Sequence, residues 1–221
     1  MDLYEAIKNR QSIRAFKNKP VSKTLLKKIM ETSLLSPSWA NSQPWEFAIV
    51  GGETLQALTE ELFELGQTEV PGNPDRPMPE QWPDLNMDRI RTLGKHMFEA
   101  MAIPREDKER RKQHYSRNYR FFGAPNIIYI YLDKALGAYS MLDAGIISQS
   151  IALLATAEGL GTCFLASSSR YPDVVREKLG IDKSKDIVLG VAIGYPDMDD
   201  ASNKFRADRA DMEEFVKWVD V

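Results

Sequence analysis

Residues 126–158 read NIIYIYLDKALGAYSMLDAGIISQSIALLATAE and combine the two elements from which the fold is predicted. Asn126 to Leu132 follows a proline and is rich in β-branched and aromatic residues, which is typical of a strand. Tyr139 to Glu158 is apolar nearly all round, which indicates a helix that is buried on most sides. Such a helix in a chain of 221 residues also suggests that a second subunit covers part of it.

Outward from this pair, helices and strands alternate irregularly, and helices outnumber strands. This pattern favours a three-layer α+β domain with a small central sheet, spanning residues 1–221 as one unit. Strands are predicted at Glu46–Val50, Thr162–Ala166 and Ile187–Ile193. Helices are predicted from hydrophobic periodicity and caps at Asp2 to about Arg10, Ser22 to Pro37, Thr54–Leu65, Met87–Met101, Arg105–Phe122, Pro172 to Gly180 and Asp211–Val219.

The composition is that of a globular protein, with 43% hydrophobic and 28% charged residues. A net charge of -3 gives no electrostatic attraction to nucleic acid or anionic lipid. Cys163 is the only cysteine, which excludes an intrachain disulfide and favours a reducing compartment. The first residues lack the features of a signal peptide, and residues 139–157 are too polar for an easy membrane span. We therefore expect a soluble cytoplasmic protein.

A proline-rich stretch at about 67–86 interrupts the periodic pattern. Five of the twelve prolines fall between Pro71 and Pro83. A loop of this length is usually a lid, a binding loop or a disordered segment, and a surface excursion without a role is an equal alternative.

Several familiar sites are absent from the sequence. There is no G-x-S-x-G elbow, Walker loop or H-E-x-x-H motif. Two histidines and one cysteine make a tetrahedral zinc site improbable, and no metal is expected. Cys163 lies in a β-prone run and is interpreted as a small buried residue rather than a nucleophile. Residues 159–164 begin like a dinucleotide fingerprint, but Phe164 stands in place of the third glycine and the run enters a strand.

Two short basic segments point to an anionic ligand. Arg10-Gln-Ser-Ile-Arg14 follows the first helix, and if it is extended, Arg10, Ser12 and Arg14 project on one side. Two guanidinium groups and a hydroxyl suit a phosphate or a polar ring edge. Alternatively, these are exposed arginines on a strand edge. Asn203 to Arg209 forms the second segment, and the two could hold one anion between them.

Several motifs together resemble the FMN-dependent nitroreductase family in order and spacing. They are RQSIRAF at 10–16, SPSWANSQPW at 36–45, EGLGT at 158–162, GVAIGYP at 190–196 and RADR at 206–209. The resemblance implies a nitroreductase-like α-β-α fold with a mostly antiparallel sheet. It also implies an intertwined homodimer with FMN sites at the subunit interface.

The same resemblance implies which residues hold FMN. The ribityl phosphate and the ring edge of FMN would be contacted by Arg10, Gln11, Ser12 and Arg14. Arg206 and Arg209 would complete the phosphate site. Those lying along the flavin from the other subunit would be Pro37, Ser38, Trp39 and Asn41. Leu160 and Gly161 would lie near the ring, with a backbone N–H directed at its N5 atom. Gln11 departs from the family, because many relatives have a second arginine there, and 67–86 matches no family pattern.

The loop at 36–45 places two tryptophans among small hydrogen-bonding groups. This mixture suits a surface that contacts a flavin ring, whose faces are apolar and whose rim is polar. Trp45 abuts a predicted strand and is expected to pack in the core, whereas Trp39 is expected near the flavin or the substrate. Tyr115, Asn118 and Tyr119 could contact the ligand or pack within a helical core.

The activity implied is hydride transfer from NADH or NADPH, through FMN, to an electron-poor small molecule such as a nitroaromatic or quinone. No catalytic side chain is assigned, because the cofactor carries the chemistry. Three alternatives stay open at this point. The same flavin site could perform reductive dehalogenation or dehydrogenation, the protein could bind FMN without turnover, or it could bind a phosphate ligand and no flavin.

Overall fold

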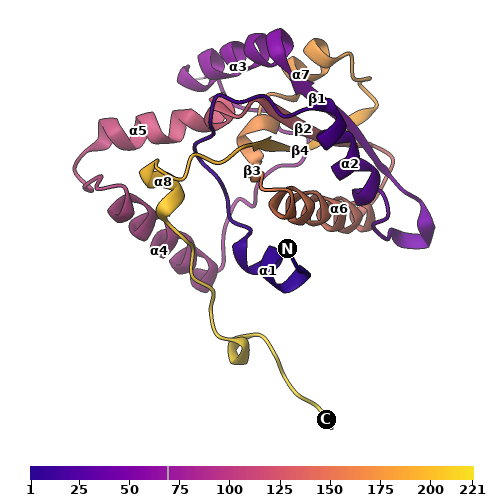
Figure 1. Ribbon diagram of the computed structural model, residues 1–221. Helices are drawn as coiled ribbons and strands as arrows, with labels where there is room; N and C mark the ends of the chain where they lie inside the picture. Colours follow the sequence, from indigo (N-terminus) through magenta and orange to yellow (C-terminus); the bar gives the residue numbers. More distant parts are fainter. Residues whose placement is uncertain (69) are drawn as a thin grey trace.

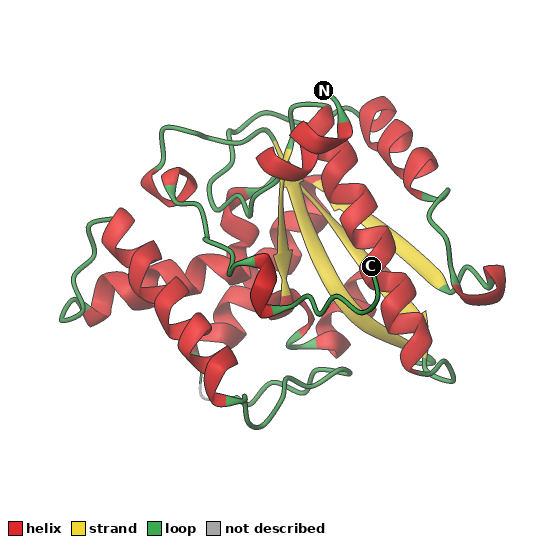
Figure 2. Cartoon of the chain, turned by 90° about the horizontal axis from the view of Figure 1, so that it is seen from below, coloured by secondary structure: helices red, strands yellow, loops and turns green. Residues whose placement is uncertain are grey.

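The computed structural model describes residues 1–68 and 70–221, and a four-stranded sheet lies at its centre (Figures 1 and 2). The strands are β1 (Trp45–Gly51), β2 (Asn126–Asp133), β3 (Gly161–Leu165) and β4 (Lys185–Gly194). Their order is β1-β2-β4-β3, and every neighbouring pair is antiparallel. The predicted α+β class and all four predicted strands are confirmed.

Helices cover both faces of the sheet, because the side chains of the inner strand β2 alternate between two cores, one on each face. Ile127 and Tyr129 belong to one core, and Ile128 and Ile130 belong to the other. The first core is covered by α3 (Gly52–Gln67), α7 (Pro172–Leu179) and the 3₁₀ segment η2 (Arg117–Gly123). The second core is covered by α2 (Lys23–Ser33) and α6 (Ala138–Ala157).

Helix α6 is buried on one side only, so the prediction of burial on most sides is wrong for the single chain. Ala144, Ile147 and Ile151 pack in the core, whereas Tyr139 and Leu142 are exposed. Within the described part of the chain, α6 alone is long and apolar enough to cross a membrane by length and composition. Its buried side nevertheless packs on the sheet, as in a core helix of a globular domain.

Two further helices, α4 (Asp84–Ala100) and α5 (Lys108–Ser116), project beside the sheet (Figure 1). The end of α4 contributes to a third, smaller core against which Phe205 packs. The predicted helix Arg105–Phe122 is too long, because η2 replaces its last turns and Phe121 and Phe122 adopt positive φ values of 48° and 55°. That backbone buries both phenylalanine rings in the first core.

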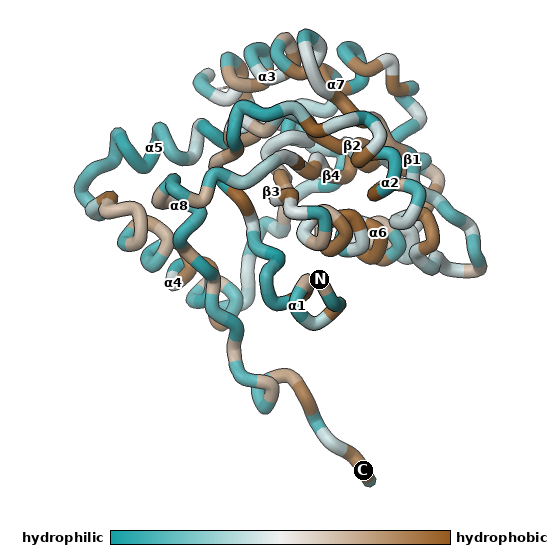
Figure 3. The backbone as a smooth tube through the Cα atoms, in the orientation of Figure 1, coloured by the Kyte–Doolittle hydropathy of each residue, from teal (hydrophilic) through white to brown (hydrophobic). Residues whose placement is uncertain are grey.

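The predicted C-terminal helix Asp211–Val219 is wrong. A single 3₁₀ turn, η4 (Met212–Glu214), forms there, and the chain then runs away from the body (Figure 3). The short helix α8 (Ala201–Lys204) before it was not predicted. A nine-residue helix is marginal in water unless one face packs on something, and Phe215 and Trp218 are exposed.

The proline-rich segment is irregular from Val70 to Pro83, and Glu69 lies outside the described residues. Its first half is anchored to α7 and to the beginning of β4. The carboxylate of Asp75 pairs with Arg176 and accepts a hydrogen bond from Ile187 N at 2.8 Å. These contacts place residues 70–76 at the Lys185 end of β4, away from the Gly194 end, where the predicted N-terminal site residues lie.

Candidate functional site

The stretch Arg10–Phe16 is extended and runs along the edge of the sheet. Ser12 forms a parallel bridge with Thr162 of β3, and Ile13 N donates to Thr162 O at 2.9 Å. Phe16 forms an antiparallel bridge with Pro196, just beyond β4. The condition set in the sequence analysis, that this segment is extended, is therefore met.

Gly161 lies where this stretch approaches the sheet most closely. A Cβ atom at this position would lie 2.4 Å from Ile13 Cγ1, so any larger residue would push the Arg10–Phe16 stretch away. Leu160 beside it is buried in the second core. The sequence predicted these two residues near a ligand; the structure adds that the glycine is required for packing.

The C-terminal basic segment reaches back to the same edge. Phe205 packs against α4, and the guanidinium of Arg206 donates to Lys8 O in α1 (Leu3–Asn9). Arg209 Nη1 donates to the carbonyl oxygens of Ala207 and Asp208 at 2.8 and 3.0 Å. Both arginines are exposed, and hydrogen bonds to carbonyl oxygens leave their positive charges unneutralised.

Arg10, Arg206 and Arg209, hereafter the basic cluster, lie close enough to repel one another. Burial and then the charges of Arg209 and Arg206 lower the pKa of Arg10. Throughout residues 1–68 and 70–221, no carboxylate forms an ion pair with any member of this cluster. Three like charges without a carboxylate partner are chemically suited to an anionic ligand.

A cavity of about 280 Å³ lies against this edge, and Gln11, Leu160, Gly161 and Arg206 are among its lining residues. Gln11 Nε2 donates to Asn203 O at 3.1 Å. Its Oε1 is buried and has no hydrogen-bond partner within the described chain. A buried acceptor without a donor is costly, so this atom is suited to accept from a ligand N–H or O–H.

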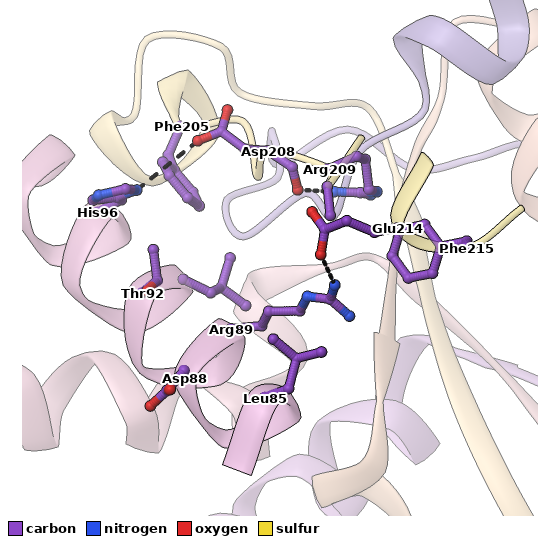
Figure 4. A pocket seen from close by; sticks show the side chains of 12 residues that line it. Leu85, Asp88, Arg89, Thr92, His96, Phe205, Asp208, Arg209, Glu214 and Phe215 are labelled. Atoms are coloured by element: carbon purple, nitrogen blue, oxygen red, sulfur yellow. Dashed lines mark hydrogen bonds and ion pairs between the residues drawn. The ribbon is translucent and has the colours of Figure 1, made fainter. Parts of the chain in front are cut away.

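A second cavity of about 550 Å³ lies between α4 and the C-terminal segment (Figure 4). Arg209 lines it, and two contacts tether the segment to α4. Arg89 Nη2 lies 2.7 Å from Glu214 Oε2, and His96 Nδ1 lies 3.9 Å from Asp208 Oδ2. The basic cluster thus has a cavity on each side, with Arg206 facing one and Arg209 facing the other.

The loop at residues 36–45 is attached to α6. Trp39 N donates to Asp143 Oδ1 at 3.0 Å, and Ser36 Oγ donates to Ser150 Oγ at 2.7 Å. The Trp39 ring stacks on Tyr139 with 6.0 Å between ring centroids. Asp143 is buried, and its Oδ2 has no partner among the residues that the structure describes.

The two tryptophans of this loop have different environments, and the prediction is confirmed for Trp45 alone. Trp45 is 6% exposed and packs in the second core, which confirms its structural role. Trp39 lies on the 3₁₀ turn η1 (Trp39–Asn41) and is 64% exposed. Its predicted position near a flavin stays a prediction.

Within one chain, the loop and the basic cluster stay apart. Pro37, Ser38, Trp39 and Asn41 make no hydrogen bond to Arg10–Arg14 or to the basic cluster in the described residues. In Figure 1 the η1 turn projects on the right, whereas α8 lies on the left. The structure therefore brings together the N- and C-terminal halves of the predicted site, but not the loop.

Of the remaining candidates, Asn118 and Tyr119 are partly buried, whereas Tyr115 is 55% exposed. Tyr115 makes an edge contact with Phe98 at 5.5 Å between ring centroids, and Asn118 Nδ2 donates to Tyr115 O at 2.9 Å. Tyr119 packs against the first core. Cys163 is buried, and burial raises the pKa of its thiol to about 11, so its interpretation as a small core residue is confirmed.

The sequence did not reveal three residues at this edge. Asn203 is buried and contacts the Arg10–Phe16 stretch, and Arg117 Nη2 donates to Arg14 O at 2.8 Å. His114 is buried behind Arg117, and burial together with the charges of Arg117 and Arg14 lowers its pKa to about 4. Asn203 opens the predicted basic segment, but a single asparagine in a polar run carries no periodic signal.

Comparison with known proteins gives one consistent result. The sequence profile described as "Nitroreductase family" matches residues 7–195. The 4-nitrobenzoate reductase of Pseudomonas putida is 29% identical over 218 residues, which cover 99% of this chain and 96% of that protein. Nitroreductase NfnB of Mycolicibacterium smegmatis is 29% identical over 213 residues, 96% of this chain and 90% of that protein.

Solved structures agree with the sequence matches. The FMN and NADPH-dependent nitroreductase NfnB from Sphigopyxis sp. strain HMH has a TM-score of 0.95 at 29% identity and is covered over 100% of both chains. The FMN-dependent NfnB from Mycobacterium smegmatis, solved in complex with NADPH, has a TM-score of 0.92 at 29% identity. The latter match covers 99% of this chain and 100% of the other.

Proposed function

The chain belongs to the nitroreductase family, and from this premise we infer that it is an FMN-dependent NAD(P)H oxidoreductase that reduces nitroaromatic compounds. The observation that carries the inference is the basic cluster, in which Arg10, Arg206 and Arg209 lie together without a carboxylate partner in the described chain. Relatives of similar length that reduce 4-nitrobenzoate or bind FMN and NADPH support the same reading.

The residues present fit FMN. The basic cluster matches the charge of its phosphate, and Ser12 and Arg14 lie on the same extended stretch as Arg10. The unpaired Oε1 of Gln11 is available to a polar edge of the ligand, and Leu160 and Gly161 line the adjacent cavity. Bound FMN would supply the two-electron chemistry between NAD(P)H and the acceptor. The chain supplies binding, orientation and charge, and no side chain is assigned as an acid or base.

We place the complete site at the interface of a homodimer. The exposed outer side of α6 and the helix α1 packed beside it carry a group of exposed apolar residues: Leu3, Tyr4, Ile7, Tyr139, Leu142 and Ile146. The loop is fixed to the same helix through Asp143. Covering this surface with a second copy would bury it and carry Pro37, Ser38, Trp39 and Asn41 toward the partner's flavin.

We also treat residues 1–221 as one domain of a cytoplasmic protein. One sheet receives strands from both halves of the chain, and the relatives match over nearly its whole length. The buried cysteine is consistent with a reducing compartment.

The test is an anaerobic absorbance titration of the purified protein after saturation with FMN. Flavin bands that bleach on addition of NADH or NADPH, and return on addition of 4-nitrobenzoate, would support the proposal and name the donor. A quinone and a halogenated aromatic compound serve as parallel acceptors. Protein that binds no FMN would overturn the proposal, and bound flavin that neither donor reduces would make it a binding protein.

Sedimentation equilibrium of the same sample tests the shared site. We expect a dimer whose loading with FMN falls on dilution below the dimer dissociation constant. A monomer that binds FMN normally would contradict the interface assignment.

A further inference from the structure

Asn203 occupies the point where the N-terminal stretch and the C-terminal basic segment meet. It is 1% exposed, although it lies in a polar, mostly exposed part of the chain. It precedes Arg206 and Arg209 and contacts the stretch that begins at Arg10. Its position inside the short helix α8 does not by itself explain why this polar side chain is buried.

The side chain of Asn203 makes three hydrogen bonds that join its own segment to two others. Its Oδ1 accepts from Arg14 N at 2.6 Å. Its Nδ2 donates to Ala15 O at 2.8 Å and to Asp197 O at 2.7 Å. No other residue type of this size offers one acceptor and two donors in this arrangement.

The main chain of Asn203 adds a fourth link to the same site. Asn203 O accepts from Gln11 Nε2 at 3.1 Å, and this bond orients the side chain whose Oε1 is left without a partner. Arg14 is held from both sides, because its N–H donates to Asn203 and its carbonyl oxygen accepts from Arg117.

The members of the basic cluster repel one another, so their arrangement needs neutral groups to hold it before an anion arrives. Within the described chain, the C-terminal basic segment is joined to the N-terminal region by the bond from Arg206 to Lys8 O and by the bonds of Asn203. The Asn203 side-chain amide is uncharged, buried and hydrogen-bonded at both Oδ1 and Nδ2, so it joins the two backbones without neutralising the cations.

We propose that Asn203 is a positioning residue for phosphate recognition, because it holds the Arg10–Ala15 and Arg206–Arg209 segments in the register that assembles the basic cluster. This inference rests on the proposed function, in which the phosphate is that of FMN. Asn203 does not touch the ligand; it acts through the three arginines. An aspartate in its place would direct a carboxylate oxygen at two carbonyl oxygens, those of Ala15 and Asp197, and would push the segments apart.

The test compares FMN with riboflavin, which has the same ring and no phosphate. Dissociation constants for both are measured by quenching of flavin fluorescence with wild-type protein, Asn203→Ala and Asn203→Asp. We expect FMN binding to weaken roughly tenfold or more, as for one lost hydrogen bond to a charged group, and riboflavin binding to change less than about twofold. The preference for FMN over riboflavin should therefore fall.

Tyr171→Phe is the matched control. This side chain is also buried, and its hydroxyl lies 3.2 and 3.1 Å from the carbonyl oxygens of Leu65 and Val70, away from the basic cluster. It should lower stability while leaving the ratio of the two dissociation constants unchanged. Asn203→Ser keeps one polar group and replaces Asn203→Ala if the latter does not fold.

A double substitution separates positioning from general stability. In an Arg209→Ala background, Asn203→Ala should weaken FMN binding by clearly less than it does alone, because its effect passes through the cluster. Additive effects, an unchanged FMN-to-riboflavin ratio, or failure of every Asn203 variant to fold would overturn the inference in favour of a structural role. Wild-type protein that binds no FMN would instead overturn the proposed function.

Discussion

The two ends of strand β4 carry arginines in opposite situations. At the Lys185 end, Arg176 is 6% exposed and is bound by Asp75, by Asp173 Oδ1 at 2.7 Å and by the carbonyl oxygen of Lys185. At the Gly194 end, Arg10 meets Arg206 and Arg209 and no carboxylate within the described chain. The charge of Arg176 is therefore neutralised within the chain, whereas the charges at the Gly194 end are not, which agrees with the phosphate site that we propose there.

The pKa values express the same difference. Burial disfavours the charge of both Arg176 and Arg10. At Arg176 the carboxylates of Asp75 and Asp173 outweigh burial and raise the pKa, whereas at Arg10 the neighbouring arginines add to burial and lower it. The paired arginine thus contributes to the structure, and the lowered pKa of Arg10 is what we expect of a cation placed to meet the anion in the proposed site.

The largest expected effect is on folding at the paired end. Arg176→Ala leaves the carboxylate of Asp75, with a side chain 11% exposed, without its cation. We expect the free energy of unfolding to fall by about 3–5 kcal/mol, measured by urea denaturation, with the FMN dissociation constant of the folded fraction unchanged. Lys27→Ala is the control, because Lys27 pairs with Glu31 on the surface at 3.5 Å. A loss of FMN affinity in Arg176→Ala would remove the distinction between the two ends.

The second effect is on binding at the unpaired end. Arg10→Ala and Arg209→Ala should each weaken FMN binding by roughly 10- to 100-fold, because a hydrogen bond to a charged group is lost. Stability without FMN should not fall, since a repulsion is removed. Arg91→Ala, which removes an exposed arginine paired with Asp88 at 3.6 Å, controls for net charge. Equal FMN affinity in all three variants would contradict the phosphate assignment.

The third effect depends on pH and arises at His114, whose neighbours are Arg14 and the Arg117 that pairs with Asp200 at 3.5 Å. The folded protein holds the pKa of His114 at about 4, below the ordinary 6.5, so the unfolded chain binds a proton that the folded chain does not. This contribution to stability is complete above pH 6.5 and is lost as the pH falls toward 4, by at most about 1.4 kcal/mol per pH unit. In His114→Gln the urea midpoint of unfolding should change less between pH 6.5 and pH 4 than in the wild-type protein. His96→Gln, which replaces the exposed histidine, is the control and should keep the wild-type dependence on pH.

The smallest expected effect is that of salt on FMN binding, and it distinguishes the exposed arginines at one end of β4 from the buried ion pair at the other. Ionic strength screens exposed charges over about 10 Å at 0.1 M but has little access to buried pairs. Arg206 and Arg209 are exposed, so FMN binding should weaken severalfold in moderate salt, measured by fluorescence titration. The unfolding penalty of Arg176→Ala should stay nearly constant in the same buffers. A salt-independent FMN affinity would show that the phosphate is bound by neutral groups.

Much of the fold was predictable because local composition and burial agree. The strand Asn126–Leu132 is rich in β-branched residues and lies at the centre of the sheet, whereas the extension of Arg10–Phe16 was only a condition of the sequence argument and is supplied by the structure. The helix at Asp211–Val219 failed for the opposite reason: its apolar residues repeat, but Phe215 and Trp218 stay mostly exposed, and the contact between Phe215 and Arg89 does not bury the ring.

The candidate site was only partly predictable, because its parts depend on distant contacts. Arginines are recognisable by residue type, so Arg10, Arg206 and Arg209 were identified before their proximity was seen. Asn203 gave no signal, because its role comes from bonds to residues nearly two hundred positions away. In the proposed homodimer the placement of Trp39 depends on a second copy of the chain, which the sequence indicates through its apolar helix and the family resemblance but does not position.

The exposed apolar side of α6 has a consequence for how the protein is made. Tyr139, Leu142 and Ile146, with the helix α1 beside them, give a newly synthesised chain a surface that adheres to other unfinished chains. In the homodimer that we propose, pairing requires two folded copies to meet, so it competes with aggregation whenever chains are released quickly. Slower expression, or a supply of FMN during synthesis, should therefore raise the soluble yield more than any change to the sheet would.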